Sequence, residues 1–345
     1  MTVRESFLLA PHTSFHIGGP VRLFVEASSA EDVRAAVALA HARSLPFLPL
    51  GGGSNILVPD EGVEAVVAKI LLDNIVFDGD MVVAGAGVSW EAFVSSAAER
   101  GLWGVENLAG IPGSVGGALV QNIGAYGAEL ADTFAWTEAL NTQSGEITRL
   151  TAPDVRLAYR TSLFKERREL IILRVALALS STGEPNLAYA DLARAQEVGV
   201  ALTTPHELAT TVRAIRATKF PPSSEGGTAG SFFKNPVVTH QEAAVLAERF
   251  PGIPQFLQSE GGAKVSLAWI LDHALALKGF SVGKARLYER QPLVVVTDVG
   301  AQAADVDALA CEVARRVHEA TGITIEREVE TFGDQEDKER SDYIF

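Results

Sequence analysis

The chain has 345 residues, a length that favours two or three compact units over a single domain. Its formal net charge of −14, from 29 Lys and Arg against 43 Asp and Glu, argues against a broad nucleic-acid interface, which needs clustered cations to replace phosphate counter-ions. A hydrophobic content of 47% argues against a disordered chain.

The sequence predicts a cytoplasmic protein without a membrane segment. The apolar stretch Phe7–Pro11 lacks the basic lead-in of a signal sequence, and the run Leu170–Leu179 is interrupted by Arg174 and is too short to cross a bilayer. The one cysteine, Cys311, has no disulfide partner and is expected to be a buried thiol in a helix. The seven histidines are scattered, so we expect no metal site.

Strand, glycine turn and helix recur in the first part of the chain. The expected elements are a helix after Ser29, a strand Phe47–Leu50, a strand Met81–Ala84 and a helix from Ser89 to about Gly101. The two strands run into Gly51-Gly52-Gly53 and Gly85-Ala86-Gly87, and a third glycine-dense segment spans Gly110–Gly127. This density is unfavourable inside a helix or strand, so the third segment is expected to be backbone lying close to a ligand.

These glycine segments indicate a diphosphate cofactor, because a turn without Cβ atoms lets consecutive N–H groups approach phosphate oxygens. Each segment taken alone is also compatible with a simple tight turn. Neither Gly51-x-Gly53 nor Gly85-x-Gly87 is followed by the third glycine of a Rossmann fingerprint. A P-loop is excluded as well, since only three residues separate Gly279 from Gly283 and Ala285 stands where a hydroxyl residue is needed.

Strands dominate up to Leu179, and a capping box at Thr204 begins a helix that ends near Lys219. A linker rich in Pro, Ser and Gly, Pro221–Gly230, marks a domain boundary. Beyond it the expected elements are helices starting at Thr239, Ser266 and Gln302, the last one ending at Gly322, and then a strand in which Ile323 and Ile325 alternate with Thr324 and Glu326. Glu328 shares the polar face of that strand.

Seven segments of the chain resemble one enzyme family, the UDP-N-acetylenolpyruvoylglucosamine reductases (UDP-N-acetylmuramate dehydrogenases). Three of them, in the glycine-rich part, also fit other flavoproteins: residues 49–57 (PLGGGSNIL), 106–113 (ENLAGIPG) and 121–127 (QNIGAYG). The other four match this family specifically: residues 159–165 (YRTSLFK), 230–236 (GSFFKNP), 260–264 (EGGAK) and 326–329 (EREV).

The resemblance implies an α+β protein that has an FAD-binding fold of the vanillyl-alcohol oxidase type in two subdomains, plus a C-terminal α+β substrate-binding domain. The expected division is residues 1–65 for the first FAD-binding subdomain, 66–218 for the second and 219–321 for the substrate domain. A C-terminal strand, 322–345, is expected to return to the first subdomain. The resemblance further implies the subtype in which a loop bearing Tyr189 folds over the nucleotide sugar as a mobile lid.

The resemblance also implies an activity. NADPH would reduce a non-covalent FAD and leave, and the hydride would then pass to the vinyl carbon of UDP-N-acetylglucosamine enolpyruvate in the synthesis of peptidoglycan precursors. Arg160 matches the catalytic arginine that holds the substrate carboxylate, Ser231 the proton donor and Glu328 the carboxyl that steadies the enol form. By residue type alone, Arg160 and Glu328 fit a surface ion pair and Ser231 fits a helix cap equally well.

The remaining family positions fall into two sets. The residues expected to bind FAD are Gly51, Gly52, Gly53, Ser54, Asn55, Ile111, Pro112, Gly113, Ser114, Gly117, Asn122 and Gly124. The residues expected to bind the UDP-sugar are Tyr126, Tyr189, Lys219, Asn235 and Gln291. The glycine segments contain no His or Cys that would suggest a covalently attached flavin. The protein is expected to be a monomer.

Two departures from the family pattern are Thr161, where aspartate is usual, and Glu330, where a basic residue often stands. Glu330 adds an acid near a site that binds anions. Two other functions remain open from the sequence. One is a flavin oxidase of the same fold that uses oxygen as acceptor, and the other is a UDP-sugar sensor that kept the binding residues without the reaction.

Overall fold

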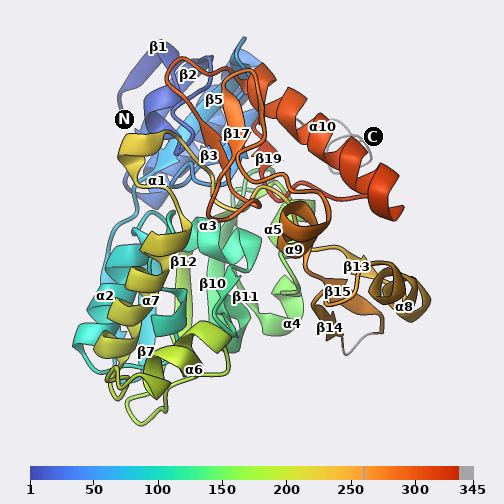
Figure 1. The fold of residues 1–345 in the computed structure, drawn as a ribbon. Helices are drawn as coiled ribbons and strands as arrows, with labels where there is room; N and C mark the ends of the chain where they lie inside the picture. Colours follow the sequence, from blue (N-terminus) through green and yellow to red (C-terminus); the bar gives the residue numbers. More distant parts are fainter. Residues whose placement is uncertain (259–260, 334–345) are drawn as a thin grey trace. The chain divides into compact units, whose positions relative to one another are not determined.

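The computed structural model describes residues 1–258 and 261–333, which form two compact units (Figure 1). The first unit comprises Met1–Phe7, Val21–Gly53 and Glu64–Ala217. The second comprises Leu8–Pro20, Ser54–Val63 and the chain from Thr218 onward. The chain therefore passes between the units several times, and the first unit ends for the last time at Ala217.

Two sheets form the framework of the first unit. The four-stranded sheet has the order β1-β2-β5-β3, and β3 runs parallel to β5. The five-stranded sheet has the order β11-β10-β12-β7-β6, with antiparallel neighbours throughout. The strands are β1 (Val3–Leu8), β2 (Pro20–Ala27), β3 (Phe47–Leu50), β5 (Val63–Ile70), β6 (Ile75–Asp78), β7 (Met81–Gly85), β10 (Phe134–Asn141), β11 (Ile147–Thr151) and β12 (Leu170–Ala178), with a small hairpin of β8 (Gly124–Ala125) and β9 (Ala128–Glu129).

Helices cover these sheets, and α2 and α7 lie side by side (Figure 1). The α-helices of the first unit are α1 (Ala30–Arg43), α2 (Trp90–Glu99), α3 (Val115–Gln121), α4 (Ala152–Val155), α5 (Leu163–Glu166), α6 (Ala190–Glu197) and α7 (Pro205–Lys219, whose last two residues fall in the second unit). Short 3₁₀ helices span Glu106–Leu108 and Leu130–Asp132.

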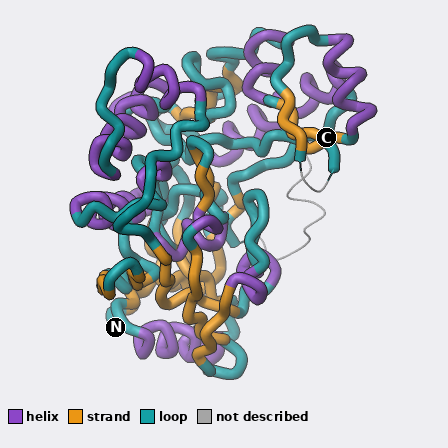
Figure 2. The backbone as a smooth tube through the Cα atoms, turned by 90° about the horizontal axis from the view of Figure 1, so that it is seen from below, coloured by secondary structure: helices purple, strands orange, loops and turns teal. Residues whose placement is uncertain are grey.

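In its described residues, the second unit combines strands of two or three residues with two longer helices. Figure 2 shows the helices, strands and loops of the chain as a tube. The sheets of the second unit have the orders β13-β15-β14, β16-β17-β18 and β19-β4. The strands are β4 (Ile56–Leu57), β13 (Val237–Val238), β14 (Gln255–Leu257), β15 (Ala263–Val265), β16 (Ser281–Val282), β17 (Ala285–Leu287), β18 (Val295–Thr297) and β19 (Glu330–Thr331). The helices are α8 (His240–Arg249), α9 (Leu267–Trp269), a π-helix (Ile270–Ala274), α10 (Ala303–Thr321) and 3₁₀ turns at Ala10–His12 and Ser223–Glu225.

Each unit has its own hydrophobic core. In the first, Trp90 and Phe93 of α2 stack at 5.5 Å between ring centroids and are fully buried. In the second, Phe232 and Phe233 meet edge to face at 5.1 Å and pack with the buried stripe of α10. Two separate cores explain why the chain divides into two units.

Local capping signals located most helix ends correctly. The Ser29 side chain accepts a hydrogen bond from Asp32 N at 3.0 Å at the start of α1, as predicted. The predicted helix from Thr204 to Lys219 is α7, and Thr204 and Glu207 form the expected reciprocal cap. Helices that begin after Thr239, Ser266 and Gln302, the last ending at Gly322, are confirmed too.

Four local expectations were wrong or incomplete. The segment Gly110–Gly127, in which no helix was expected, contains helix α3 with Gly116 and Gly117 inside it. The segment of Tyr189 was expected to be a loop, and helix α6 begins directly after Tyr189. Cys311 is exposed, because it lies on the face of α10 opposite the buried stripe of Val306, Leu309 and Val313. Residues 323–326 form no regular strand, although Ile323 and Ile325 are buried as the alternation predicted.

The strand β19 pairs in parallel with β4, Glu330 opposite Ile56. The predicted C-terminal strand reaches residue 345, and its part from 334 onward lies outside the described residues. The three-part division of the chain stays a prediction. In the described part of the chain, no helix has the length and apolarity that a membrane crossing requires.

Replacing Leu309 by alanine should lower the free energy of unfolding by about 2–5 kcal/mol, because it leaves a cavity under α10, where Leu309 is fully buried. Cys311→Ala on the exposed face of the same helix is the matched control and should change it by less than about 0.5 kcal/mol. Urea unfolding followed by circular dichroism measures both. Equal losses in the two variants would contradict the buried stripe.

Candidate functional site

Two glycine segments of the first unit lie backbone against backbone. A Cβ atom added to Gly52 would lie 2.5 Å from the Cα atom of Gly113, and one added to Gly51 would lie 2.6 Å from Ser114 Oγ. Gly53 adopts φ 66°, in the left-handed region that favours glycine. A side chain at residue 52 therefore cannot be accommodated without displacing the Gly113 backbone, whereas one at residue 51 would press on the Ser114 side chain.

The turn after β7 joins the same arrangement. Gly116 N donates to Ala86 O and Val115 N donates to Val88 O, both at 2.9 Å. A Cβ atom on Gly116 would lie 2.9 Å from that of Ala86, which explains why helix α3 carries a glycine there in spite of its low helix propensity. We call residues 51–53, 85–88 and 113–117 the glycine cluster.

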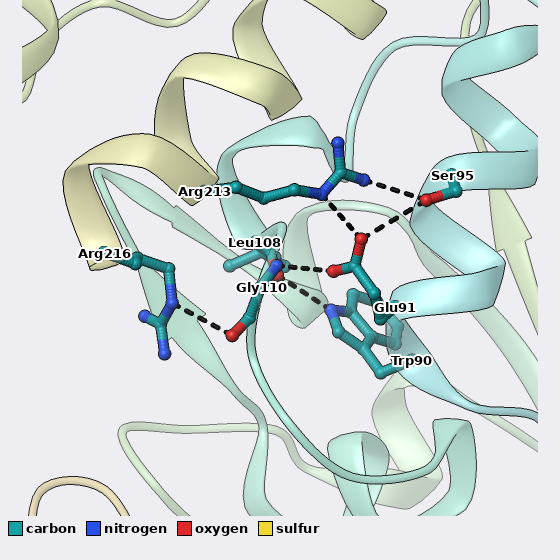
Figure 3. A network of polar contacts seen from close by, with 7 residues as sticks. All are labelled: Trp90, Glu91, Ser95, Leu108, Gly110, Arg213 and Arg216. Carbon is teal, nitrogen blue, oxygen red and sulfur yellow. Dashed lines mark hydrogen bonds and ion pairs between the residues drawn. The ribbon is translucent and has the colours of Figure 1, made fainter. Parts of the chain in front are cut away.

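A polar network holds the chain just before this cluster (Figure 3). The Glu91 carboxylate accepts from Gly110 N at 2.7 Å and from Arg213 Nε at 2.6 Å, and Arg213 also donates to Ser95 Oγ at 2.9 Å. Arg216 Nε donates to Gly110 O at 3.1 Å, and burial lowers the pKa of Arg216. Helix α2 thus binds the N–H group of Gly110 and helix α7 binds its carbonyl. These bonds fix the start of the Ile111-Pro112-Gly113 segment.

Arg160 is positioned by the β8–β9 hairpin. Its guanidinium donates to Gly124 O at 2.7 Å and to Asn122 O at 3.5 Å, and its own φ is 55°. A Cβ atom on Gly124 would come within 2.9 Å of the guanidinium, so glycine is needed for this approach. Asn122 and Tyr126 also have positive φ angles, 43° and 50°. Left-handed backbone at three predicted site residues is typical of functional segments.

The side chain of Asn122 is fully buried and engaged within the protein. Its Nδ2 donates to Glu129 Oε2 at 3.0 Å and to Ala158 O at 2.9 Å, while its Oδ1 accepts from Ala131 N at 3.0 Å. This geometry gives Asn122 a structural role in joining the hairpin to the segment that carries Arg160. Contact between Asn122 and FAD stays a prediction.

Tyr126 and Tyr189, two predicted substrate residues, meet edge to face with ring centroids 4.9 Å apart. Asn107 Nδ2 links the two segments, because it donates to Tyr126 O at 2.8 Å and to Asn186 O at 2.9 Å. Tyr126 is buried and Tyr189 is 42% exposed. The exposed ring stands at the start of α6, where it is accessible to a ligand.

In the second unit, the segments of Ser231 and Glu328 are neighbours. Glu328 N donates to Phe232 O at 2.8 Å, and Phe233 pairs with Arg327 in an antiparallel bridge. An ion pair of 2.9 Å between Lys234 and Glu326 closes the same pairing. Residues nearly a hundred positions apart in sequence are therefore brought together.

Asn55 reaches this pairing from a third segment. Its Nδ2 donates to Glu328 O at 3.1 Å, and its carbonyl accepts from Glu330 N at 3.2 Å. The second departure from the family pattern, Glu330, is thus held in strand β19 by its backbone. In the same unit, Asn235 Oδ1 accepts from Leu267 N at 3.0 Å and so caps α9.

Two further predicted substrate residues, Lys219 and Gln291, lie at a helix end and in a turn. Lys219 is the last residue of α7, and Gln291 lies in the turn before β18, where its carbonyl accepts from Val294 N at 2.9 Å. Arg160 belongs to the first unit and Ser231 and Glu328 to the second, and the meeting of all three stays a prediction. Glu260, the first residue of the family segment 260–264, lies outside the described residues.

Sequence reasoning missed Glu91, Arg213 and Arg216, because ordinary spacing on amphipathic helices gives charged residues no distinctive signal. It also missed Lys69, whose amine donates to Gly51 O. The one available signal was a lysine inside the apolar strand β5. Within the described residues, no three His, Cys, Asp or Glu side chains gather as metal ligands would.

Comparison with known proteins gives consistent matches. The family described as FAD binding domain matches residues 21–151, and the C-terminal domain of UDP-N-acetylenolpyruvoylglucosamine reductase matches residues 221–332. The reductase of that name from Pseudomonas aeruginosa is 38% identical over 95% of this chain and 98% of its own, and that from Shewanella sp. MR-4 is 36% identical over 95% and 96%. The crystal structure of UDP-N-acetylenolpyruvylglucosamine reductase from Thermus caldophilus aligns with a TM-score of 0.67 at 28% identity, covering 96% of this chain and 99% of that one.

Gly52→Ala should weaken FAD binding by about tenfold or more, because its Cβ must push the Gly113 backbone away and overpacking costs about 1–3 kcal/mol. Gly51→Ala is the matched neighbour and should lose less, since its Cβ meets only the Ser114 hydroxyl, which can rotate. Fluorescence titration of the flavin-free protein with FAD measures both. A larger loss for Gly51→Ala would contradict the backbone contact.

Proposed function

The chain belongs to the UDP-N-acetylenolpyruvoylglucosamine reductase family, and from this premise we propose that Arg160, Ser231 and Glu328 carry its reaction. The protein is an FAD-dependent oxidoreductase that uses NADPH to reduce UDP-N-acetylglucosamine enolpyruvate to UDP-N-acetylmuramate in peptidoglycan precursor synthesis. The FAD-binding fold with a separate C-terminal domain, which the sequence predicted, is confirmed by the family.

The observation that carries this assignment is the glycine cluster within the segment matched by the FAD binding domain. Residues 51–53 and 113 of the cluster carry no Cβ atoms, and a diphosphate group can approach backbone N–H donors closely where no side chain intervenes. The cluster therefore fits FAD, held by residues 51–53 and 113–117. FAD bound there would supply the hydride-transfer chemistry, from NADPH to the vinyl carbon of the substrate.

Arg160 binds the carboxylate of the enolpyruvyl group in this proposal. Hydride addition to the methylene carbon moves charge onto that carboxylate, and a guanidinium with a fixed orientation stabilises the charge as it forms. The bonds from Arg160 to Gly124 O and Asn122 O supply the orientation before substrate arrives. Preorganised donors lower the barrier because they need no rearrangement during the reaction.

Ser231 and Glu328 act on the second half of the addition. Ser231 donates the proton to the carbon next to the carboxylate, a step that its weakly acidic hydroxyl can perform only for a strongly basic enolate. Glu328 hydrogen-bonds the enol form of the intermediate and so stabilises it. The backbone bond from Glu328 to Phe232 sets the separation of their two segments.

The UDP-sugar is bound by Tyr126, Tyr189, Lys219, Asn235 and Gln291 in this proposal. The exposed Tyr189 ring already packs on Tyr126, which supports a role for the segment around Tyr189 in covering the nucleotide sugar. Lys219 supplies charge to the diphosphate. The cytoplasmic location and the monomeric state expected from the sequence stay predictions.

Anaerobic titration of the purified protein tests the function. The protein should be yellow, its flavin absorbance should bleach when NADPH is added, and the colour should return when UDP-N-acetylglucosamine enolpyruvate follows. Rapid NADPH-driven peroxide formation that ignores this substrate would instead establish an oxidase. Binding of the UDP-sugar without any change in the flavin spectrum would establish a sensor.

Ser231→Ala should leave bleaching by NADPH nearly unchanged and slow the recovery of colour by about a hundredfold to ten-thousandfold, because only the proton donor is lost. Stopped-flow absorbance measures the two half-reactions separately. Ser281→Ala, on an exposed strand of the same unit, is the control and should alter neither rate. Equal slowing of both half-reactions by Ser231→Ala would refute its assigned role.

A further inference from the structure

Lys69 lies beside the glycine cluster and has no role in the reaction described above. It sits at the carboxyl end of β5, opposite Leu50 in the parallel pairing with β3, and Gly51 follows β3 directly. Its Nζ donates to Gly51 O. Lys69 and the first residue of the glycine cluster thus share the carboxyl ends of two parallel strands, where ligands of such sheets usually bind.

The charge of Lys69 is costly where it stands. Its side chain is half-buried, and burial lowers the pKa of Lys69 because the charged form loses solvation. Among residues 1–258 and 261–333, no carboxylate forms an ion pair with it. A partly desolvated cation without an acidic partner is unfavourable unless another anion compensates for it.

We propose that this anion is the diphosphate of FAD, and that Lys69 supplies the positive charge that holds it at the glycine cluster. The inference rests on the proposed position of FAD. The hydrogen bond to Gly51 O uses one of the three N–H donors of the amine. Attraction through the partly buried interior is stronger than through water, so the amine acts on the diphosphate even from behind the loop.

A purely structural role makes a different prediction. If Lys69 only supported the Gly51 carbonyl, its loss would weaken every ligand of the cluster to the same degree. A charge that balances phosphate discriminates between flavins, because FAD carries a diphosphate whereas riboflavin has the same ring system and no phosphate. It also makes FAD binding sensitive to salt, since ions screen the attraction.

The test compares the wild-type full-length chain, Lys69→Met and Lys69→Arg, each freed of flavin and titrated with FAD and with riboflavin by fluorescence. Lys69→Met keeps the length of the side chain without its charge and should weaken FAD binding by about tenfold or more, while riboflavin binding changes by less than about twofold. Lys69→Arg keeps the charge and should retain most of the affinity for FAD. Added KCl should weaken FAD binding to the wild type more than to Lys69→Met.

Three outcomes would overturn the inference: unchanged FAD affinity in Lys69→Met, parallel loss of FAD and riboflavin, or the same salt dependence in both proteins. The salt series needs FAD alone, so it decides the matter even if riboflavin binds weakly. Circular dichroism confirms that each variant is folded. Failure of the wild type itself to bind FAD would refute the proposed function, whereas failure confined to the Lys69 comparison would refute only this inference.

Discussion

The direct contact of two backbones, at Gly52 and Gly113-Ser114, is the constraint on which the first unit depends. Backbone can meet backbone only where no Cβ intervenes, so glycine is required on sterically specific grounds. Glycine also lets an unsupported loop sample many conformations. The structure offsets this freedom at both ends, since Glu91 and Arg216 hold the Gly110 residue while Lys69 holds the Gly51 carbonyl. Fixed anchors on helices and strands thus give flexible loops a defined shape.

The second unit solves a different problem, which is to align residues that are distant in sequence. The pairing of residues 231–234 with 326–330 does so through main-chain hydrogen bonds, with Asn55 bound to the same segment. Main-chain hydrogen bonds use groups that every residue except proline carries, so the pairing tolerates different side chains. The side chains of Ser231 and Glu328 are therefore not needed for the pairing, and the buried Phe232 and Phe233 stabilise it.

The sequence predicted features that arise from local interactions. Capping residues such as Ser29, Thr204 and Thr239 make hydrogen bonds within a few residues of themselves, so their signal survives in any fold. Helix α3 was missed because its Gly116 is explained only by contact with Ala86, thirty residues away. Cys311 was predicted to be buried from its residue type. It is exposed because the buried stripe of α10 lies on the opposite face of the helix. The family resemblance predicted the site residues, and the charges around them came from the structure alone.

The balance of charge connects these observations. A chain with a net charge of −14 must bind a diphosphate cofactor, a phosphorylated hydride donor and an anionic nucleotide sugar. Salt at physiological concentration screens exposed charges beyond about 8 Å, so the overall negative charge matters less than the few cations placed close to each anion. The three cations proposed for this role stand on separate elements: Lys69 on a strand, Arg160 beside a hairpin and Lys219 at a helix end. An acidic protein can therefore bind anions where single cations lie next to backbone donors, whatever its net charge.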